Sequence, residues 1–172
     1  MTGKGHRSTG LGAGFFAAAC MHVLGFDYVA EFVAAFAAAL SVNLPDQLEF
    51  PRYKNGQRRG TRIPHRTITH WPYLWLALMY IGWQYVDPLP AALLIGLSIG
   101  ALMHILTDAP NPMGIPWVLP HRPVSLTGGL WLSGEFEKTI ATFANTGGIL
   151  TWLYVHQFLN WIPPFIAGLS RH

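Results

Sequence analysis

The chain alternates between apolar segments and short polar stretches. The apolar segments cover roughly residues 11–26, 28–44, 72–86, 89–106 and 147–169. Ala, Leu, Ile, Phe and Trp occur on all sides of these segments, so none has the polar face of an amphipathic surface helix. Several are shorter than the ~20 residues of a straight membrane-spanning helix, so three alternatives exist: tilted spans, a thinned bilayer, or buried helices of a soluble bundle. We favour the membrane: the pattern predicts an all-α, polytopic helical membrane protein with about four to five apolar helices.

Charge is scarce and clustered. Charged residues make up 11% of the sequence, whereas a soluble domain carries about 25%. Six basic residues crowd one stretch, namely Arg52, Lys54, Arg58, Arg59, Arg62 and Arg66. A basic stripe that binds nucleic acid would be interleaved with the fold, and this one is confined to a single connection. We therefore expect the lipid bilayer as a partner and no nucleic acid.

The positive charges also predict an orientation in the membrane. Two apolar segments separate Lys4 and Arg7 from the basic stretch, and two more separate that stretch from the connection at 109–146. All three regions therefore fall on one side, and excess Lys and Arg mark the cytoplasmic side. The opposite turns contain Asp27 and Asp87 and no Lys or Arg. We expect a multi-pass protein of the inner (cytoplasmic) membrane with a cytoplasmic N-terminus.

A length of 172 residues allows one domain. We expect a single membrane-embedded helical domain over residues 1–172, with a basic loop at 47–66 and a connecting loop at 109–146. Pro163-Pro164 should break or kink the last segment, so whether that segment spans the bilayer once or ends in the interface stays open. The N-terminus resembles a signal peptide, but further apolar sequence follows at once, which suits a first span better.

Six His and Asp residues lie at the ends of the apolar segments, and the expected topology places all of them at one membrane face. They are His6, Asp46, His65, His70, His104 and Asp108. His104 and Asp108 are four residues apart and share one face of a helix. An ionisable pair at the end of an apolar span is expensive unless it is matched, which favours a functional role over a helix-end hydrogen bond. His65 and His70 lie in a loop that leads into a helix, where His70 has a simple cap as its alternative role. Together the six predict a one-sided polar site.

This set of side chains suits transition metals. Imidazole combined with carboxylate favours Zn, Mn or Fe over Ca or Mg alone. A catalytic zinc uses three protein ligands and leaves one position for water, so six ligands exceed the needs of one ion. Two neighbouring ions can activate water and clamp a phosphoester. We therefore expect one or two divalent metal ions as cofactor.

Two further residues are candidates for catalysis. Arg66 lies beside the His pair, and its guanidinium matches an anionic group such as phosphate; ordinary cytoplasmic positive charge is the alternative. Glu135 can act as a general base or an additional ligand, although a polar residue at a helix start is the simpler interpretation. His22 and His156 lie within apolar segments, where we expect packed and hydrogen-bonded histidines.

Four motifs, in order along the chain, resemble one known family: the membrane-bound metal-dependent hydrolases, also called LexA-regulated inner-membrane hydrolases or YdjM-like proteins. The motifs are His6 with Gly10, Pro45-Asp46, the stretch His65-Arg66-Thr67-Ile68-Thr69-His70, and His104 with Asp108 before Asn111-Pro112-Met113-Gly114. The family's Pro-Asp motif often continues with a second Asp and a His, whereas this chain continues with Gln47-Leu48-Glu49. The resemblance implies a hydrolase with fewer ligands near Asp46, and it does not identify the substrate.

We therefore predict a membrane-bound metal-dependent hydrolase that acts on an ester or phosphoester with metal-activated water. A lipid or lipid-linked substrate is attractive because the site would lie at the depth of the headgroups. The rival hypothesis is a non-enzymatic membrane protein in which the His/Asp cluster binds metal for structural or transport purposes. Transport would need polar residues that continue to the far side, and only His22, Glu31, Ser98 and His156 lie within the spans. This sparse path argues against transport, and a structural metal stays open.

Overall fold

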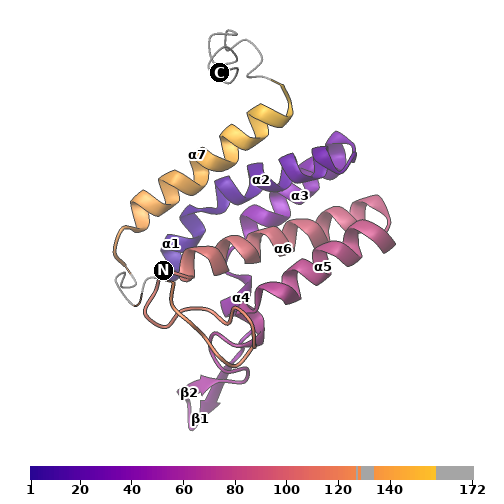
Figure 1. The fold of residues 1–172 in the computed structure, drawn as a ribbon. Helices are drawn as coiled ribbons and strands as arrows, with labels where there is room; N and C mark the ends of the chain where they lie inside the picture. Colours follow the sequence, from indigo (N-terminus) through magenta and orange to yellow (C-terminus); the bar gives the residue numbers. More distant parts are fainter. Residues whose placement is uncertain (127, 129–133, 158–172) are drawn as a thin grey trace.

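In a computed structural model of the chain, the described residues are 1–126, 128 and 134–157, and they form a mostly helical protein (Figure 1). The helices are α1 (Gly3–Ser8), α2 (Gly10–Val23), α3 (Tyr28–Ser41), α4 (Leu44–Gln47), α5 (Pro72–Tyr85), α6 (Pro88–Asp108) and α7 (Glu137–Val155). A 3-10 turn covers Ile68–His70, and strand β1 (Pro51–Lys54) pairs antiparallel with β2 (Gln57–Thr61).

Helices α2, α3, α5 and α6 fall on the first four predicted apolar segments. The fifth predicted segment, at 147–169, needs a correction. The corresponding helix, α7, begins at Glu137, so the connecting loop covers 109–136 rather than 109–146. The prediction for Pro163-Pro164 lies outside the described residues. Proline and aspartate stand at the starts of two helices, where proline lacks an N–H that would be unpaired and aspartate can accept from a free backbone N–H. Pro88 is the first residue of α6, and the Asp27 side chain caps α3 by accepting a hydrogen bond from Ala30 N–H at 2.9 Å.

Helix α3 buries small residues and exposes large ones. In α3, Ala30, Ala34 and Ala38 are buried, while Phe32 and Phe36 are exposed. The alanines face α2 and α6, against which α3 packs. In water, folding is driven by burial of large apolar side chains, so a soluble bundle would show the opposite arrangement. Small residues at helix contacts are typical of membrane bundles, where close backbone approach supplies van der Waals attraction.

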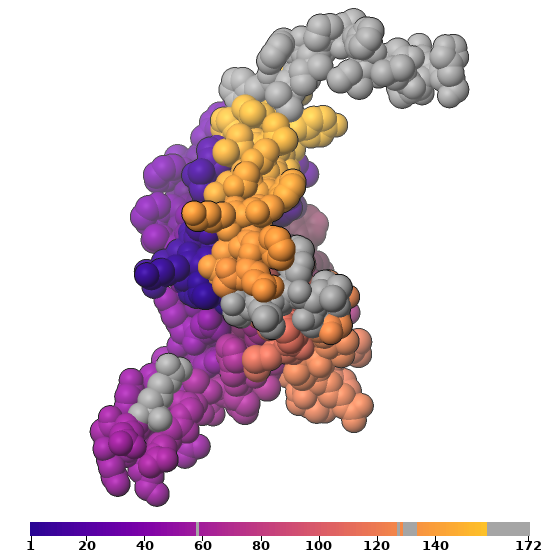
Figure 2. Space-filling view, turned by 90° about the vertical axis from the view of Figure 1, so that its left-hand side faces the viewer, coloured from indigo at the N-terminus to yellow at the C-terminus, as the bar shows by residue number. Residues whose placement is uncertain are grey.

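Helix α7 lies along α2 on one face of the molecule, as Figure 2 shows. The two backbones approach closely at Gly12 and Gly148, where a Cβ atom on Gly148 would collide with the carbonyl oxygen of Gly12. The Gly12 N–H also donates to Oδ1 of Asn145 at 2.8 Å. Glycine on both helices therefore sets the spacing between α2 and α7.

Among the described residues, α6 is the one helix whose length and composition suffice to cross a bilayer. Its 21 residues span ~31 Å at 1.5 Å per residue, which matches a hydrocarbon core of ~30 Å. The apolar helices α2 and α3 have 14 residues each and span ~21 Å. A bilayer around α2 and α3 would therefore have to be thinner than average.

The loops and short elements that connect the long helices gather at two opposite ends of the bundle (Figure 1). At one, which we call the polar end, α1, α4 and the 3-10 turn meet the last turn of α6. At the other, the far end, the turns at 24–27 and 86–87 connect α2 to α3 and α5 to α6. The order of the apolar segments predicts this arrangement, because each pair of helices returns the chain to the polar end.

Part of the predicted basic loop at 47–66 is a β-hairpin, which also corrects the all-α prediction to mostly helical. Its turn is Asn55-Gly56, with φ values of 54° and 73°, and Asn-Gly is the pair that favours such a tight hairpin turn. The residues of β1 are all exposed. The hairpin projects from the polar end (Figure 2) and carries Arg52, Lys54 and Arg59 away from the helices.

Candidate metal centre

The structure brings all six predicted ligands together at the polar end. His6 comes from α1, Asp46 from α4, His65 from the loop after β2, His70 from the 3-10 turn, and His104 and Asp108 from the last turns of α6. Their side-chain nitrogen and oxygen atoms fall into two adjoining groups, Asp46, His65 and His70 in one, and His6, His104 and Asp108 in the other. Contacts between His70, Asp46 and His104 join the two groups. With Glu49, described below, we call this set the polar-end cluster.

Three ligand atoms at the centre of this cluster form a triangle of the size that a metal ion requires. Nε2 of His70 lies 3.2 Å from Nε2 of His104. Oδ1 of Asp46 lies 3.4 Å from the first nitrogen and 3.6 Å from the second. Ligands about 2.0–2.1 Å from a tetrahedral metal ion are separated by roughly 3.3–3.4 Å. The triangle therefore fits one face of a metal coordination sphere.

The hydrogen bonds of His104 leave Nε2 as its bare nitrogen. Nδ1 lies 2.8 Å from the backbone carbonyl of Val42, which can only accept, so the ring proton sits on Nδ1. Nε2 then carries a lone pair, and it faces carboxylate oxygens of Asp46 at 3.6 Å and Asp108 at 3.8 Å. A second hydrogen bond that fixes the ring tautomer is the usual support of a metal-binding histidine.

His6 and Asp108 stand beside this triangle. The ring of His6 stacks on that of His104 with centroids 3.7 Å apart, and its Nδ1 contacts Oγ1 of Thr107 at 3.0 Å. Nε2 of His6 is buried without a hydrogen bond and lies 3.3 Å from Oδ1 of Asp108. The α-ammonium group of Met1 also contacts this oxygen. A buried imidazole nitrogen without a donor or acceptor partner is costly, and a cation next to Asp108 would satisfy it.

The sequence prediction missed Glu49, which is buried beside His65 and His70. Its carboxylate lies 2.8 Å from Nδ1 of His65 and 3.4 Å from Nδ1 of His70, and it accepts the Arg66 N–H at 3.1 Å. Asp46 and Glu49 are three residues apart at the end of α4, and this spacing is the signal that could have found it.

The site is open on one side. The side chains of Asp46 and His65 are 39% and 43% exposed, whereas the other members are buried. Burial alone would raise the pKa of Asp46, but the hydrogen bond from His70 and the charges of His104, His70 and His65 outweigh it and lower the pKa. The pKa of His65 is raised, chiefly by its hydrogen bond to Glu49. Asp46 therefore stays ionised at the mouth of the site.

Arg66 is buried, and its guanidinium contacts protein groups. One nitrogen lies 2.7 Å from Oδ2 of Asp108, and another donates to the Gly114 carbonyl at 2.9 Å. Arg66 has φ 57°, a conformation unusual for arginine. These contacts favour an arginine that orients Asp108 over one that grips a substrate.

Glu135 is exposed just before α7, and the groups of potential ligands among the described residues do not contain it. Its neighbour Glu137 begins α7 and accepts a hydrogen bond from Oγ1 of Thr2 at 2.9 Å. The placement agrees with the simpler interpretation of these glutamates as polar residues near a helix start.

Comparison with known proteins adds one finding. A model of a protein family described as YdjM inner membrane protein matches residues 1–166 of the chain. No curated protein sequence and no solved structure matches. The family match covers all four motifs on which the sequence resemblance depended, and it confirms that resemblance.

Proposed function

Because the chain belongs to the YdjM inner membrane protein family, we propose that it is a polytopic inner-membrane hydrolase with a divalent metal site at its polar end. The N-terminus lies in the cytoplasm, and residues 1–172 form one membrane-embedded domain. The metal is Zn, Mn or Fe, the ions that mixed imidazole and carboxylate ligands favour.

The observation that carries this proposal is the triangle of His70 Nε2, His104 Nε2 and Asp46 Oδ1, with sides of 3.2, 3.4 and 3.6 Å. His104 presents a bare nitrogen to two carboxylates, an arrangement that a cation stabilises. His6, His65 and Asp108 lie close enough to complete the coordination of this ion or to hold a second one. A divalent metal supplies a Lewis acid and lowers the pKa of water at such a site.

The remaining side chains orient the ligands and hold protons. Arg66 fixes the carboxylate of Asp108 through its 2.7 Å contact. Glu49 contacts His65 and His70 at their Nδ1 atoms, so that Nε2 of His70 faces Asp46 and His104. Because His65 is half-exposed and bonded to a buried carboxylate, this pair can take up or release a proton at the mouth of the site.

An ester or phosphoester of a lipid is the substrate class that suits the location. The open side, with Asp46 and His65, lies at the end of the spanning helices, where headgroups reside. The exposed arginines of the hairpin stand beside it and attract anionic headgroups. These features support a substrate whose polar group reaches the site from the membrane surface.

The test is the metal content of detergent-purified protein, measured by plasma mass spectrometry together with hydrolysis of phosphoester and lipid-ester probes. His70→Ala and His104→Ala should each remove at least one equivalent of metal and all hydrolysis. The matched control is His121→Ala, which removes an exposed histidine outside the cluster. Unchanged metal content in both cluster variants would refute the site.

A non-enzymatic structural metal is the second candidate, favoured by one observation: the ligands are mostly buried and join α1, α4, the 3-10 turn and α6. It predicts that wild-type protein binds metal, unfolds when a chelator removes it, and hydrolyses none of the probes. Hydrolysis that depends on His104 would exclude it.

A further inference from the structure

A second cluster of histidine and carboxylate side chains lies at the far end of the bundle, away from the site described above. His22 belongs to the last turn of α2, Glu31 to the first turn of α3, and His156 follows α7 directly. Nδ1 of His22 lies 2.9 Å from Oε1 of Glu31, and Nε2 of His156 lies 2.9 Å from Oε2. We propose that this far-end cluster is a second binding site for a divalent transition metal, independent of the hydrolase site.

The hydrogen bonds of His156 require a cation. Its Nδ1 lies 3.0 Å from the backbone carbonyl of Trp152, and its Nε2 faces the carboxylate of Glu31. Both oxygens can only accept hydrogen bonds, and a neutral imidazole has one N–H to donate. A proton or a metal ion must therefore lie between Nε2 and the Glu31 carboxyl group. The Trp152 carbonyl fixes the tautomer in which Nε2 is the ligand, as outer partners of metal-binding histidines do.

Burial and charge favour a metal over a proton. The side chains of Glu31 and His156 are each 6% exposed, and that of His22 is 35% exposed. The rings of Tyr28 and Trp152 lie near the ring of His156. In the described part of the chain, the ion pairs of Glu31 join it to His22 and His156, so a divalent ion is the charge that would balance the carboxylate and satisfy both rings at once. The rings of His22 and His156 lie side by side with centroids 3.9 Å apart and planes tilted by 33°. One ligand atom from each of His22, Glu31 and His156 lies within 4.8 Å of the others.

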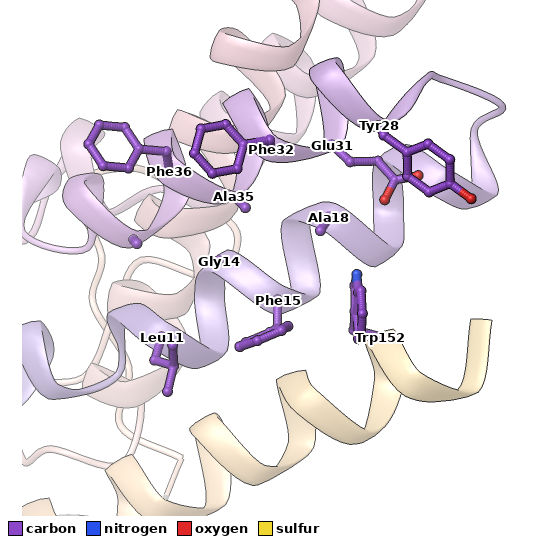
Figure 3. A pocket seen from close by; sticks show the side chains of 11 residues that line it. Leu11, Gly14, Phe15, Ala18, Tyr28, Glu31, Phe32, Ala35, Phe36 and Trp152 are labelled. Carbon is purple, nitrogen blue, oxygen red and sulfur yellow. The ribbon is translucent and has the colours of Figure 1, made fainter. Parts of the chain in front are cut away.

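The ligand set is the one that zinc uses when it keeps an open position, two histidines and one glutamate. Glu31 lines a groove of about 440 Å³ between α2, α3 and α7, together with Tyr28 and Trp152. Figure 3 shows these three side chains at one end of the groove, with Phe15 and Phe32 farther along it. Trp152 also packs on the ring of His156 with centroids 4.6 Å apart. The open coordination position can therefore be reached through the groove.

The experiment separates this site from the hydrolase site by removing the latter first. In the His70→Ala/His104→Ala background variant, titration with Zn²⁺ should show one equivalent of zinc bound per protein chain, at the far-end cluster. Adding His22→Ala/His156→Ala should remove that equivalent, whereas adding His121→Ala should not. Substitution by Co²⁺ should give the visible absorption bands of a four-coordinate ion, and these bands should vanish with the same two histidines. Retention of the equivalent after loss of His22 and His156, or no binding in the background, would overturn the proposal in favour of a protonated His156.

Two safeguards keep the result decisive. If the background variant does not fold, wild type is compared with His22→Ala/His156→Ala, and equal zinc content in the two overturns the proposal. Glu31→Gln keeps the shape of the side chain and removes its charge, so Zn²⁺ affinity should fall at least tenfold while the fold persists, since changes to mere outer partners already cost about 10–100-fold. If the wild-type protein hydrolysed no probe but still bound the equivalent of zinc at the far end, the proposed function would fail and the far-end metal site would stand.

Discussion

The polar-end and far-end clusters use the same side chains in different surroundings. At the polar end, ring nitrogens face one another across 3.2 Å, a buried arginine holds one carboxylate, and two members are exposed. At the far end, one carboxylate lies between two imidazoles at 2.9 Å from each, and no Arg or Lys forms an ion pair with Glu31 among the described residues. The comparison teaches that the two clusters differ in their outer partners: a buried arginine balances a carboxylate at the polar end, whereas histidines are the ion-pair partners of Glu31 at the far end in the described part of the chain.

Arg66 should distinguish the two clusters most strongly. Arg66→Ala leaves Asp108 buried without its 2.7 Å partner, and breaking a buried pair in this way costs about 3–5 kcal/mol. We expect a matching loss in the free energy of unfolding in detergent, loss of hydrolysis, and an unchanged far-end metal equivalent. The exposed Arg62→Ala is the control, and its effect should stay within about 0.5 kcal/mol. Equal effects of the two variants would contradict the role assigned to Arg66.

Glu49 should matter through the histidines that it holds. Glu49→Gln weakens the contacts to His65 and His70, so metal affinity at the polar end should fall about 10–100-fold. Glu31→Gln should instead weaken the far-end site and leave the polar end unchanged. Isothermal titration with Zn²⁺ measures both. If each variant weakened both sites equally, the two clusters would not be independent.

A substitution at the contact between α2 and α7 should change zinc binding at the far-end cluster without altering any of its ligands. Gly148→Ala places a methyl group against the Gly12 carbonyl, and overpacking of this kind costs about 1–3 kcal/mol. The displacement of α7 should also draw His156 away from Glu31 and lower far-end zinc affinity. Gly147→Ala is the matched control, because a Cβ atom there meets open space. Thermal unfolding and zinc titration should separate the neighbouring substitutions, and identical results would refute the argument.

The smallest effect is expected at the hairpin. Arg59→Ala removes one exposed charge near the polar end, and each such charge contributes about 1 kcal/mol to attraction toward an anionic membrane surface. The apparent KM for an anionic lipid probe should rise while kcat is unchanged, and the difference should disappear at high salt. Gln57→Ala, an uncharged exposed position on β2, provides the control. A change in kcat would place Arg59 closer to the chemistry than we propose.

Much of the polar end could be predicted from sequence because its clues are local. His104 and Asp108 share a helix face by their spacing, and helix order alone brings them to His70 and Asp46. The Asn-Gly pair at 55–56 and the three-residue spacing of Asp46 and Glu49 were also local signals. They were missed because the stretch at 47–66 was interpreted only as a basic loop. The early start of α7 was missed because residues 137–146 are less apolar than the segment that follows.

The far-end cluster could not be predicted, for a physical reason. His22 and His156 each stand alone in an apolar segment, where a packed histidine is the simplest interpretation. Their partnership depends on a contact between α2 and α7, more than a hundred residues apart, that the backbones of Gly12 and Gly148 make possible. Sequence spacing carries no information about such a contact.

The short helices α2 and α3 have a consequence for the lipid itself. In the proposed topology, their 14 residues span ~21 Å, well below an average hydrocarbon thickness of ~30 Å. The leaflets must dip around them, because a mismatch is relieved by thinning the bilayer. Headgroups are then drawn toward the mouth of the polar-end site, so the rate of the proposed hydrolysis should depend on membrane thickness. Short-chain lipids should bring the substrate within reach at little elastic cost, and long-chain lipids should hold it away.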